Sequence, residues 1–225
     1  MGLCNHLLIV LQKDTTASTL TWLFYELARK PRIFNKLRTE ILTTIGLFNS
    51  PTYNDLKNMK YLKNTISETL RLYPTVPFNV RYTLRPSSLP QGGVGPFRDP
   101  ESKQRPIGVL PGTVVAYSTF LLHRNPALYP AASPTFAPVD TFSPERWENW
   151  IPRPWQFIPF SGGPRICLGQ NFALTEVGYT VARILQRFSH IELAASSNAG
   201  ELVLIPDIVL QPGNPVLVRL FPRVA

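Results

Sequence analysis

Cysteine, histidine and charge are all scarce in this sequence of 225 residues. Its two cysteines, Cys4 and Cys167, exclude a disulfide framework and an all-cysteine metal site. Its three histidines stand outside any recognisable catalytic signature, which leaves a cysteine nucleophile without an evident base and a zinc ion with too few soft ligands. Charged residues make up 16% and hydrophobic residues 44%, which indicates a folded globular chain and not a disordered one.

Long apolar runs are lacking as well, and the basic residues are spread along the chain, with one denser stretch from Arg29 to Arg38. The longest apolar run near the start, Leu7 to Leu11, is far shorter than the roughly 20 residues that span a bilayer, and we expect no signal peptide. The net charge is +9, but the basic residues are not interleaved with base-stacking aromatic residues, which argues against nucleic-acid binding. A basic surface suits an acidic protein partner instead.

The apolar periodicity predicts a mainly helical chain with small β-sheets, arranged as one domain. The helices are expected over 3–30, 31–45, 54–72 and 168–188. Residues 74–155 carry much of the proline and predict turns with short strands, and 201–221 predict further short strands.

The segment FSGGPRICLG (160–169) is the most informative one. Gly163 and the glycine before it permit close backbone approaches, and Gly169 lets a flat group lie against the turn. Cys167 stands where a helix is expected to begin, so free N–H groups favour a thiolate there, and Arg165 can hold a carboxylate. These features predict the proximal side of a haem with a cysteine ligand; the alternative is a buried cysteine that acts as a small hydrophobe.

The fixed positions Phe160, Gly163, Arg165, Cys167 and Gly169 match all five positions of the haem-binding signature of the cytochrome P450 family, which the chain therefore resembles. The resemblance implies that Cys167 is the axial thiolate, that Phe160 packs near its sulfur and that Arg165 meets a haem propionate. It also implies insertion of one oxygen atom from O2 into a C–H bond of a lipophilic substrate. The electrons would come from NADPH through a reductase.

Two further motifs fall in the order of that family. Glu68-Thr-Leu-Arg71 places a carboxylate and a guanidinium on one helical face, which alone predicts only an ordinary helix ion pair. Phe142-Ser-Pro-Glu-Arg146 resembles the second arginine motif of the family, and the resemblance implies a buried network of Glu68, Arg71 and Arg146 that fixes the cysteine loop. Arg81 stands where the family often has another propionate partner; the alternative is a solvated loop arginine.

The first helix carries Asp14 and Thr15. The resemblance implies that Asp14 supplies protons and that Thr15 holds a hydrogen bond on the oxygen side. The alternative is that Thr15 and Thr16 only bond back to their own helix. The family has a small residue and then glycine just before this motif, whereas Leu11 and Gln12 stand there, and these larger side chains would crowd the oxygen site.

A narrower resemblance is carried by four other segments, Leu89 to Gly93, Val115 to Ser118, His123-Arg124 and Gly169 to Glu176. They resemble the fungal alkane and fatty-acid hydroxylase branch, which hydroxylates long chains, often at the terminal carbon. Relatives of that branch also oxidise polyketide- or terpene-like metabolites. The fold and the motifs do not select among these substrates.

The resemblance covers about residues 13–225 and only the C-terminal half of the family domain. The resemblance implies a membrane anchor that places the parent enzymes in the endoplasmic reticulum membrane, and we expect no counterpart of it in these residues. We expect that residues 1–12 come from a misplaced start or that the gene is truncated. We also expect that the chain alone binds haem weakly and aggregates through exposed core surface.

The sequence thus predicts a haem-dependent monooxygenase and leaves two alternatives. The first is an inactive remnant or regulatory fragment without haem, which Leu11 and Gln12 favour. The second is a haem-binding protein without monooxygenase activity, such as an isomerase or a sensor, against which Asp14 and Thr15 argue.

Overall fold

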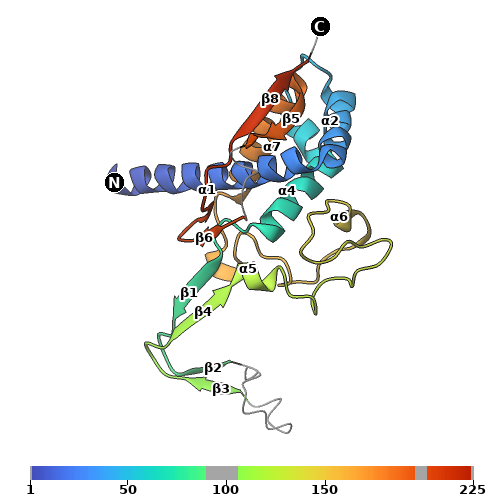
Figure 1. The fold of residues 1–225 in the computed structure, drawn as a ribbon. Helices are drawn as coiled ribbons and strands as arrows, with labels where there is room; N and C mark the ends of the chain where they lie inside the picture. Colours follow the sequence, from blue (N-terminus) through green and yellow to red (C-terminus); the bar gives the residue numbers. More distant parts are fainter. Residues whose placement is uncertain (1, 90–105, 196–201, 224–225) are drawn as a thin grey trace. The chain divides into compact units, whose positions relative to one another are not determined.

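The structure is a computed structural model that describes residues 2–89, 106–195 and 202–223, with side chains from Asp14 onward. Most of the Leu89 to Gly93 motif and the side chains of Leu11 and Gln12 lie outside the described residues. Contacts divide the chain into two compact units. The smaller unit is Phe78–Ser118, and the larger one holds the chain before and after it (Figure 1).

The larger unit is mainly helical, as the sequence predicts. Its helices are α1 (Gly2–Arg29), α2 (Pro31–Ile45), α3 (Tyr53–Asn58), α4 (Lys60–Leu72), α5 (Thr119–Leu122), α6 (Arg146–Asn149), the 3-10 helix η2 (Gly163–Arg165) and α7 (Gln170–Arg187). Its strands are β5 (Phe188–Leu193), β6 (Leu204–Pro206), β7 (Leu210–Pro212) and β8 (Val218–Pro222). β5 pairs antiparallel with β8, and β6 pairs antiparallel with β7. None of the helices in the described ranges has the length and hydrophobicity required to cross a membrane.

The core of the larger unit lies where α1, α2, α4 and α7 contact one another. In α2, Pro31 occupies the first turn, where its missing N–H costs nothing, and the buried residues recur at helical spacing. Burial of one apolar face therefore holds each helix in place. The fully buried apolar side chains include Trp22, Leu23, Leu27, Phe34, Leu37, Ile41, Leu62, Val181 and Leu185.

The helix predicted over 54–72 is broken at Met59, and this part of the prediction is wrong. Met59 has an extended backbone (ψ 99°) and buries its side chain in the core. The carboxylate of Glu40 accepts hydrogen bonds from the backbone N–H groups of Tyr61 and Leu62, both at 2.8 Å. These donors belong to the first turn of α4, so a residue of α2 starts a new helix there and fixes its position.

Polar contacts join α1 to the chain that follows α4 and to the start of β7. The Ser18 hydroxyl and the Trp22 indole both donate to the carbonyl oxygen of Leu210, at 2.7 and 3.2 Å. The backbone N–H of Leu210 in turn donates to Thr75 O at 2.9 Å. Trp22 also stacks on Tyr73 with a centroid distance of 4.4 Å. Three segments far apart in the sequence are therefore held together in the larger unit.

The smaller unit consists of two antiparallel strand pairs. β1 (Phe78–Tyr82) pairs with β4 (Val114–Ser118), and β2 (Ser87–Leu89) pairs with β3 (Ile107–Val109). Most of its large apolar side chains are exposed.

Candidate functional site

The segment around Cys167 forms a closed loop. The backbone N–H of Cys167 donates to Phe160 O at 2.9 Å, and that of Ile166 donates to Gly163 O at 3.1 Å. Gly163 has a φ of 66°, in the left-handed region that favours glycine. The following helix α7 begins at Gln170, three residues after Cys167 and two later than the sequence predicts. Cys167 therefore lies in the turn before the helix, and the turn is held by its own backbone.

Gly162 allows a tryptophan ring to pack against this loop. A Cβ atom at Gly162 would lie 2.6 Å from Cζ3 of Trp155, closer than real contacts permit. The close approach that the sequence predicts for this glycine is thus made by a side chain of the chain itself.

The Cys167 thiol is free and exposed, and its apolar neighbours in the chain are exposed as well. Leu168 is 98% exposed, and Ile166 and Phe172 are exposed as well. Arg165, two residues before the cysteine, is exposed beside them. A free thiol among uncovered apolar side chains, with a cation close by in the chain, fits a flat apolar group that carries carboxylates. The residues present therefore fit a haem, with Cys167 as its protein ligand.

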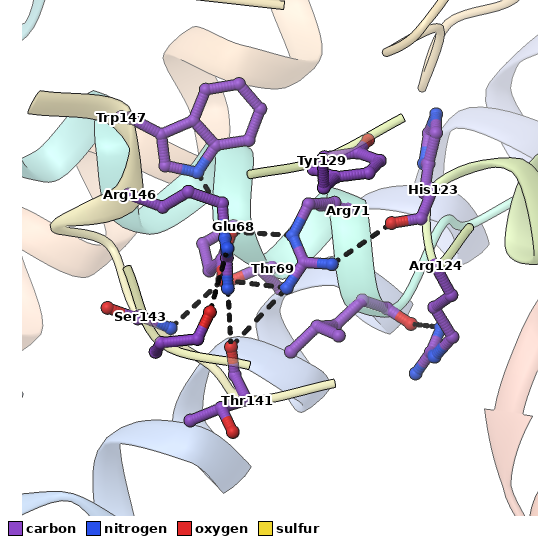
Figure 2. A network of polar contacts seen from close by, with 12 residues as sticks. Glu68, Thr69, Arg71, His123, Arg124, Tyr129, Thr141, Ser143, Arg146 and Trp147 are labelled. Atoms are coloured by element: carbon purple, nitrogen blue, oxygen red, sulfur yellow. Dashed lines mark hydrogen bonds and ion pairs between the residues drawn. The ribbon is translucent and has the colours of Figure 1, made fainter. Parts of the chain in front are cut away.

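A buried network of charges lies at the centre of Figure 2. Glu68 and Arg71 are fully buried and form a double hydrogen bond, at 2.8 Å to Nε and 2.9 Å to Nη2 of the arginine. Arg146 Nε reaches the same carboxylate at 3.5 Å. The backbone N–H of Ser143 and the indole N–H of Trp147 also donate to it, both at 3.0 Å. The three charged residues that the sequence singles out are thus brought together (Figure 2).

The two guanidinium groups carry more positive charge than one carboxylate neutralises, and backbone carbonyls provide their remaining partners. Arg71 and Arg146 both reach the carbonyl of Thr141 at 3.4 Å. The other carbonyls that accept from these two arginines belong to His123, Ala137 and Pro138. Removal of one charged partner from such a buried set leaves another uncompensated, which costs about 3–5 kcal/mol.

His123 and Trp147 extend this network toward the cysteine loop. The His123 ring is fully buried, and its Nε2 accepts a hydrogen bond from the backbone N–H of Ile158 at 3.0 Å. Burial lowers the pKa of His123 to about 4; the backbone of Leu70 and Arg71 acts to raise this pKa, but burial and the positive charges of Arg71 and Arg124 outweigh it. The ring is therefore neutral near neutral pH.

Sequence reasoning missed these two residues as parts of the site. His123 appears there only within a branch motif, and Trp147 is not named there. A buried histidine that accepts a backbone N–H leaves no spacing pattern along the chain. The signal that could have found Trp147 is its place next to the second arginine motif.

The two residues expected on the oxygen side lie in α1. Asp14 is exposed and Thr15 is half-buried. Thr16 is buried, and its hydroxyl has no hydrogen-bond partner among the described residues. Within the described chain, the Thr16 hydroxyl therefore makes no hydrogen bond to a carbonyl of its own helix and can still bond to another group.

Arg81 lies in the smaller unit. Its side chain donates to Val80 O at 2.9 Å, and its guanidinium is 5.8 Å from the centroid of the Tyr117 ring. In the register of the strand pair it faces Val115. The residues named here, Val80, Tyr117 and Val115, belong to the same unit as Arg81.

Comparisons with known proteins identify the family of the chain. The family described as Cytochrome P450 matches residues 13–216. The chain is 49% identical over 207 residues to cytochrome P450 monooxygenase pvhE of Talaromyces variabilis, covering 92% of this chain and 37% of that protein. It is 45% identical over 186 residues to cytochrome P450 52A13 of Debaryomyces hansenii (80% and 34% covered). It is 44% identical over 191 residues to cytochrome P450 monooxygenase alt2 of Alternaria solani (82% and 33% covered).

The chain spans about a third of the length of these curated relatives. The match to the family extends from α1, where Asp14 and Thr15 lie, to the chain after β7. It includes the buried network and the cysteine loop. The chain belongs to the cytochrome P450 family.

Proposed function

We propose that the chain is part of a haem-thiolate monooxygenase and that Cys167 is the axial ligand of the haem iron. The observation that carries the proposal is the free, exposed thiol of Cys167 in a loop closed by its own backbone and flanked by exposed apolar side chains. When bound, the haem supplies the activation of dioxygen and the insertion of one oxygen atom into a C–H bond.

The residues of the loop would hold the cofactor. Arg165 is exposed and offers its guanidinium to a propionate, which favours a bidentate hydrogen bond. Phe160 is half-buried, packs against the core and would lie near the sulfur. Gly163 and Gly169 keep the turn free of side chains, so a flat ring could approach the backbone. Arg81 would be a second propionate partner.

The buried network would fix this loop, and the first helix would handle protons. Arg71 and Arg146 donate to backbone carbonyls of the chain that leads to the loop, and Glu68 accepts from the backbone N–H of Ser143, which supports a positioning role. Asp14 is exposed to water and would supply protons, and Thr15 would hold a hydrogen bond on the oxygen side.

The partners follow from the family. We propose a lipophilic substrate, either a long-chain alkane or fatty acid or a fungal secondary metabolite, because the sequence resembles the fungal branch that oxidises such molecules. Electrons would come from NADPH through a cytochrome reductase, and the parent enzyme would work at the endoplasmic reticulum membrane. Both compact units would belong to one catalytic domain, because a single family match runs through both.

The first test is the difference spectrum of the reduced chain with carbon monoxide, measured after expression with haem supplied. Because the chain alone is expected to bind haem weakly, the red-shifted Soret band of a thiolate-ligated haem should be small for the unchanged chain, but present. Cys167→Ser should abolish this band, because a hydroxyl does not replace the thiolate. Cys4→Ser, at the only other cysteine, is the matched control and should keep it. A folded chain without the band, or a band that survives Cys167→Ser, would contradict the proposal.

A further inference from the structure

We infer that His123 is a positioning residue for the cysteine loop, because its ring accepts the backbone N–H of Ile158 and thereby connects the buried charge network to the segment that carries Cys167. As far as the haem is concerned, the inference rests on the proposed function. The contacts of His123 themselves are independent of any cofactor.

The backbone of His123 is fixed on the side of the network. Its carbonyl oxygen accepts a hydrogen bond from Arg71 Nη1 at 3.0 Å (Figure 2). Its N–H donates to Thr119 O at 2.9 Å, within the single turn of α5. Since Arg71 is also bound twice to Glu68, the position of His123 is set by the buried carboxylate.

The ring of His123 fixes the chain on the side of the loop. Its Nε2 lies 3.0 Å from the backbone nitrogen of Ile158, and the carbonyl of Ile158 accepts from Ser161 N–H at 3.0 Å. Phe160, between these two residues, accepts from the N–H of Cys167 at 2.9 Å. A short series of backbone contacts thus leads from the histidine ring to the residue that bears the thiol.

An aromatic contact holds the same segment from a second direction. Phe157 lies between two rings, with centroids 5.0 Å from His123 and 4.7 Å from Trp147. The indole of Trp147 donates to Glu68 at 3.0 Å. Both paths begin at the buried Glu68–Arg71 pair, and both end just before the cysteine loop. Of these two kinds of contact, the hydrogen bond from Ile158 to His123 depends more on geometry than the ring contact, because the acceptor atom must lie in line with the N–H.

The acceptor role requires one form of the ring. Nε2 receives a hydrogen bond, so it carries no proton, and the hydrogen of the neutral ring is on Nδ1. Among the described residues no partner of Nδ1 lies at an ordinary hydrogen-bond distance and angle, although the backbone of Leu70 acts on the ring in the direction that raises its pKa. The charged groups that face the ring, Arg71 and Arg124, are both positive and disfavour a second proton. His123 therefore presents a permanent acceptor to Ile158 near neutral pH.

Two amide substitutions separate this role from simple packing. Gln carries its amide oxygen at about the distance of Nε2, whereas Asn is one methylene shorter and reaches only about as far as Nδ1. Both are polar, uncharged and smaller than histidine, so they disturb the core in a similar way. His123→Gln should keep the bond to Ile158, and His123→Asn should lose it.

The primary measurement is amide hydrogen exchange of the full haem-free chain, followed residue by residue. In His123→Asn, exchange at Ile158 and Cys167 should accelerate at least about tenfold, while His123→Gln should stay within about threefold of the unchanged chain. The amide of Val181, in the buried middle of α7, reports whether each variant is folded. Equal exchange at Ile158 in the two variants, with Val181 protected in both, would overturn the inference.

A second measurement connects the contact to the thiolate. With haem supplied, His123→Asn should shift part of the reduced carbon monoxide spectrum from the thiolate band toward the band of a protonated thiol, and His123→Gln should restore the thiolate band. A full thiolate band in both variants would overturn the link between His123 and the cysteine. If the unchanged chain itself shows no thiolate band, the proposed function fails, and the exchange rates still decide the role of His123.

Discussion

At the scale of single residues, Glu145 connects α2 to the segment that carries Arg146. Its carboxylate accepts hydrogen bonds from the Tyr61 hydroxyl at 2.8 Å and from Arg32 at 3.0 Å, and Lys36 lies 3.4 Å away. Burial alone would raise the pKa of Glu145, but the hydrogen bonds from Tyr61 and Arg32 outweigh it and lower this pKa to about 2. The ionised form is therefore preferred in the folded chain.

The stabilisation from Glu145 should depend on pH. Because the folded pKa is depressed, the contribution is complete above the ordinary pKa of 4.5 and is lost as the pH falls toward about 2. The carboxylate is partly exposed, so solvent screening reduces the expected effect to about 1–2 kcal/mol. Glu145→Gln should lower the free energy of unfolding by this amount at pH 7 and flatten its decline between pH 4.5 and 2 in urea titrations.

The control for this prediction is Glu148→Gln. Glu148 is also bound by Lys36, at 2.9 Å, but Tyr61 and Arg32 do not donate to it among the described contacts. Its replacement should change the free energy of unfolding by less than about 0.5 kcal/mol. Parallel pH curves for Glu145→Gln and the unchanged chain would show that the contacts of Glu145 do not stabilise the fold.

The sequence predicts the charged members of the network and misses their neutral partners. Glu68 and Arg71 are three residues apart on one helix, a spacing that pattern analysis can use. The N–H of Ser143 and the carbonyl of Thr141 are backbone groups, which every residue type has, so the sequence holds no sign of their role. Burial of the His123 ring depends on contacts with residues more than thirty positions away.

At the scale of elements, α7 contains a glycine with room for a side chain. A Cβ atom at Gly178 would lie 3.7 Å from Leu56 and Leu62 and 3.9 Å from Ile66, which are ordinary contacts. Glycine in a helix interior costs roughly 0.5–1 kcal/mol relative to alanine. Gly178→Ala should therefore raise the free energy of unfolding by about that amount, as measured in urea titrations.

The matched control is Gly162→Ala in the cysteine loop. There the added methyl would lie 2.6 Å from the Trp155 ring, so the indole must move, and we expect no gain in stability. A lower free energy of unfolding for Gly178→Ala would mean that α3 and α4 lie closer to α7 than the distances given above.

The long helices are predictable from the sequence, and the short ones are not. The apolar periodicity of α2 spans four turns and identifies it without tertiary information. The four-residue helices α5 and α6 are too short to show any periodicity, so the sequence only predicts turn-rich chain there. The break at Met59 depends on Glu40 of a different helix, which local patterns do not include.

At the scale of the whole molecule, the two compact units differ in how their strands are supported. The paired strands β1 and β4 lie in the smaller unit. Among the described residues of that unit, Val109 is the one apolar residue whose side chain is buried. Two-stranded sheets without a packed face are marginally stable in water. The β5–β8 pair has the same number of strands but contacts α1, and its Ile191 is 2% exposed.

Hydrogen exchange should therefore rank the two strand pairs. Amides that bond β1 to β4 should exchange at least about 100-fold faster than those that bond β5 to β8, because local opening of the smaller unit costs little. The amides of α4 report global unfolding and should be the slowest. Equal protection of the two strand pairs would mean that the smaller unit is stabilised by contacts beyond those found within it.

The family and the fold class are predictable at this scale, whereas the division into units is not. Five fixed positions around Cys167 are enough to indicate a cytochrome P450, because their residue types and spacing match the signature of that family, and the family match includes them. The boundaries at Phe78 and Ser118 are set by which strands pair with each other. Such pairing joins residues about forty positions apart and leaves no mark in composition.

The buried network also determines where this chain can tolerate mutation. Ala137 and Thr141 contact Arg146 through their carbonyl oxygens. Any amino acid that fits the local backbone geometry supplies the same oxygen. Substitutions at these two positions therefore leave the contacts with Arg146 intact. Arg146 contributes a guanidinium that no other residue type reproduces. Variation among descendants of this gene should accumulate in the irregular segment that the arginines hold, while the arginines themselves stay fixed.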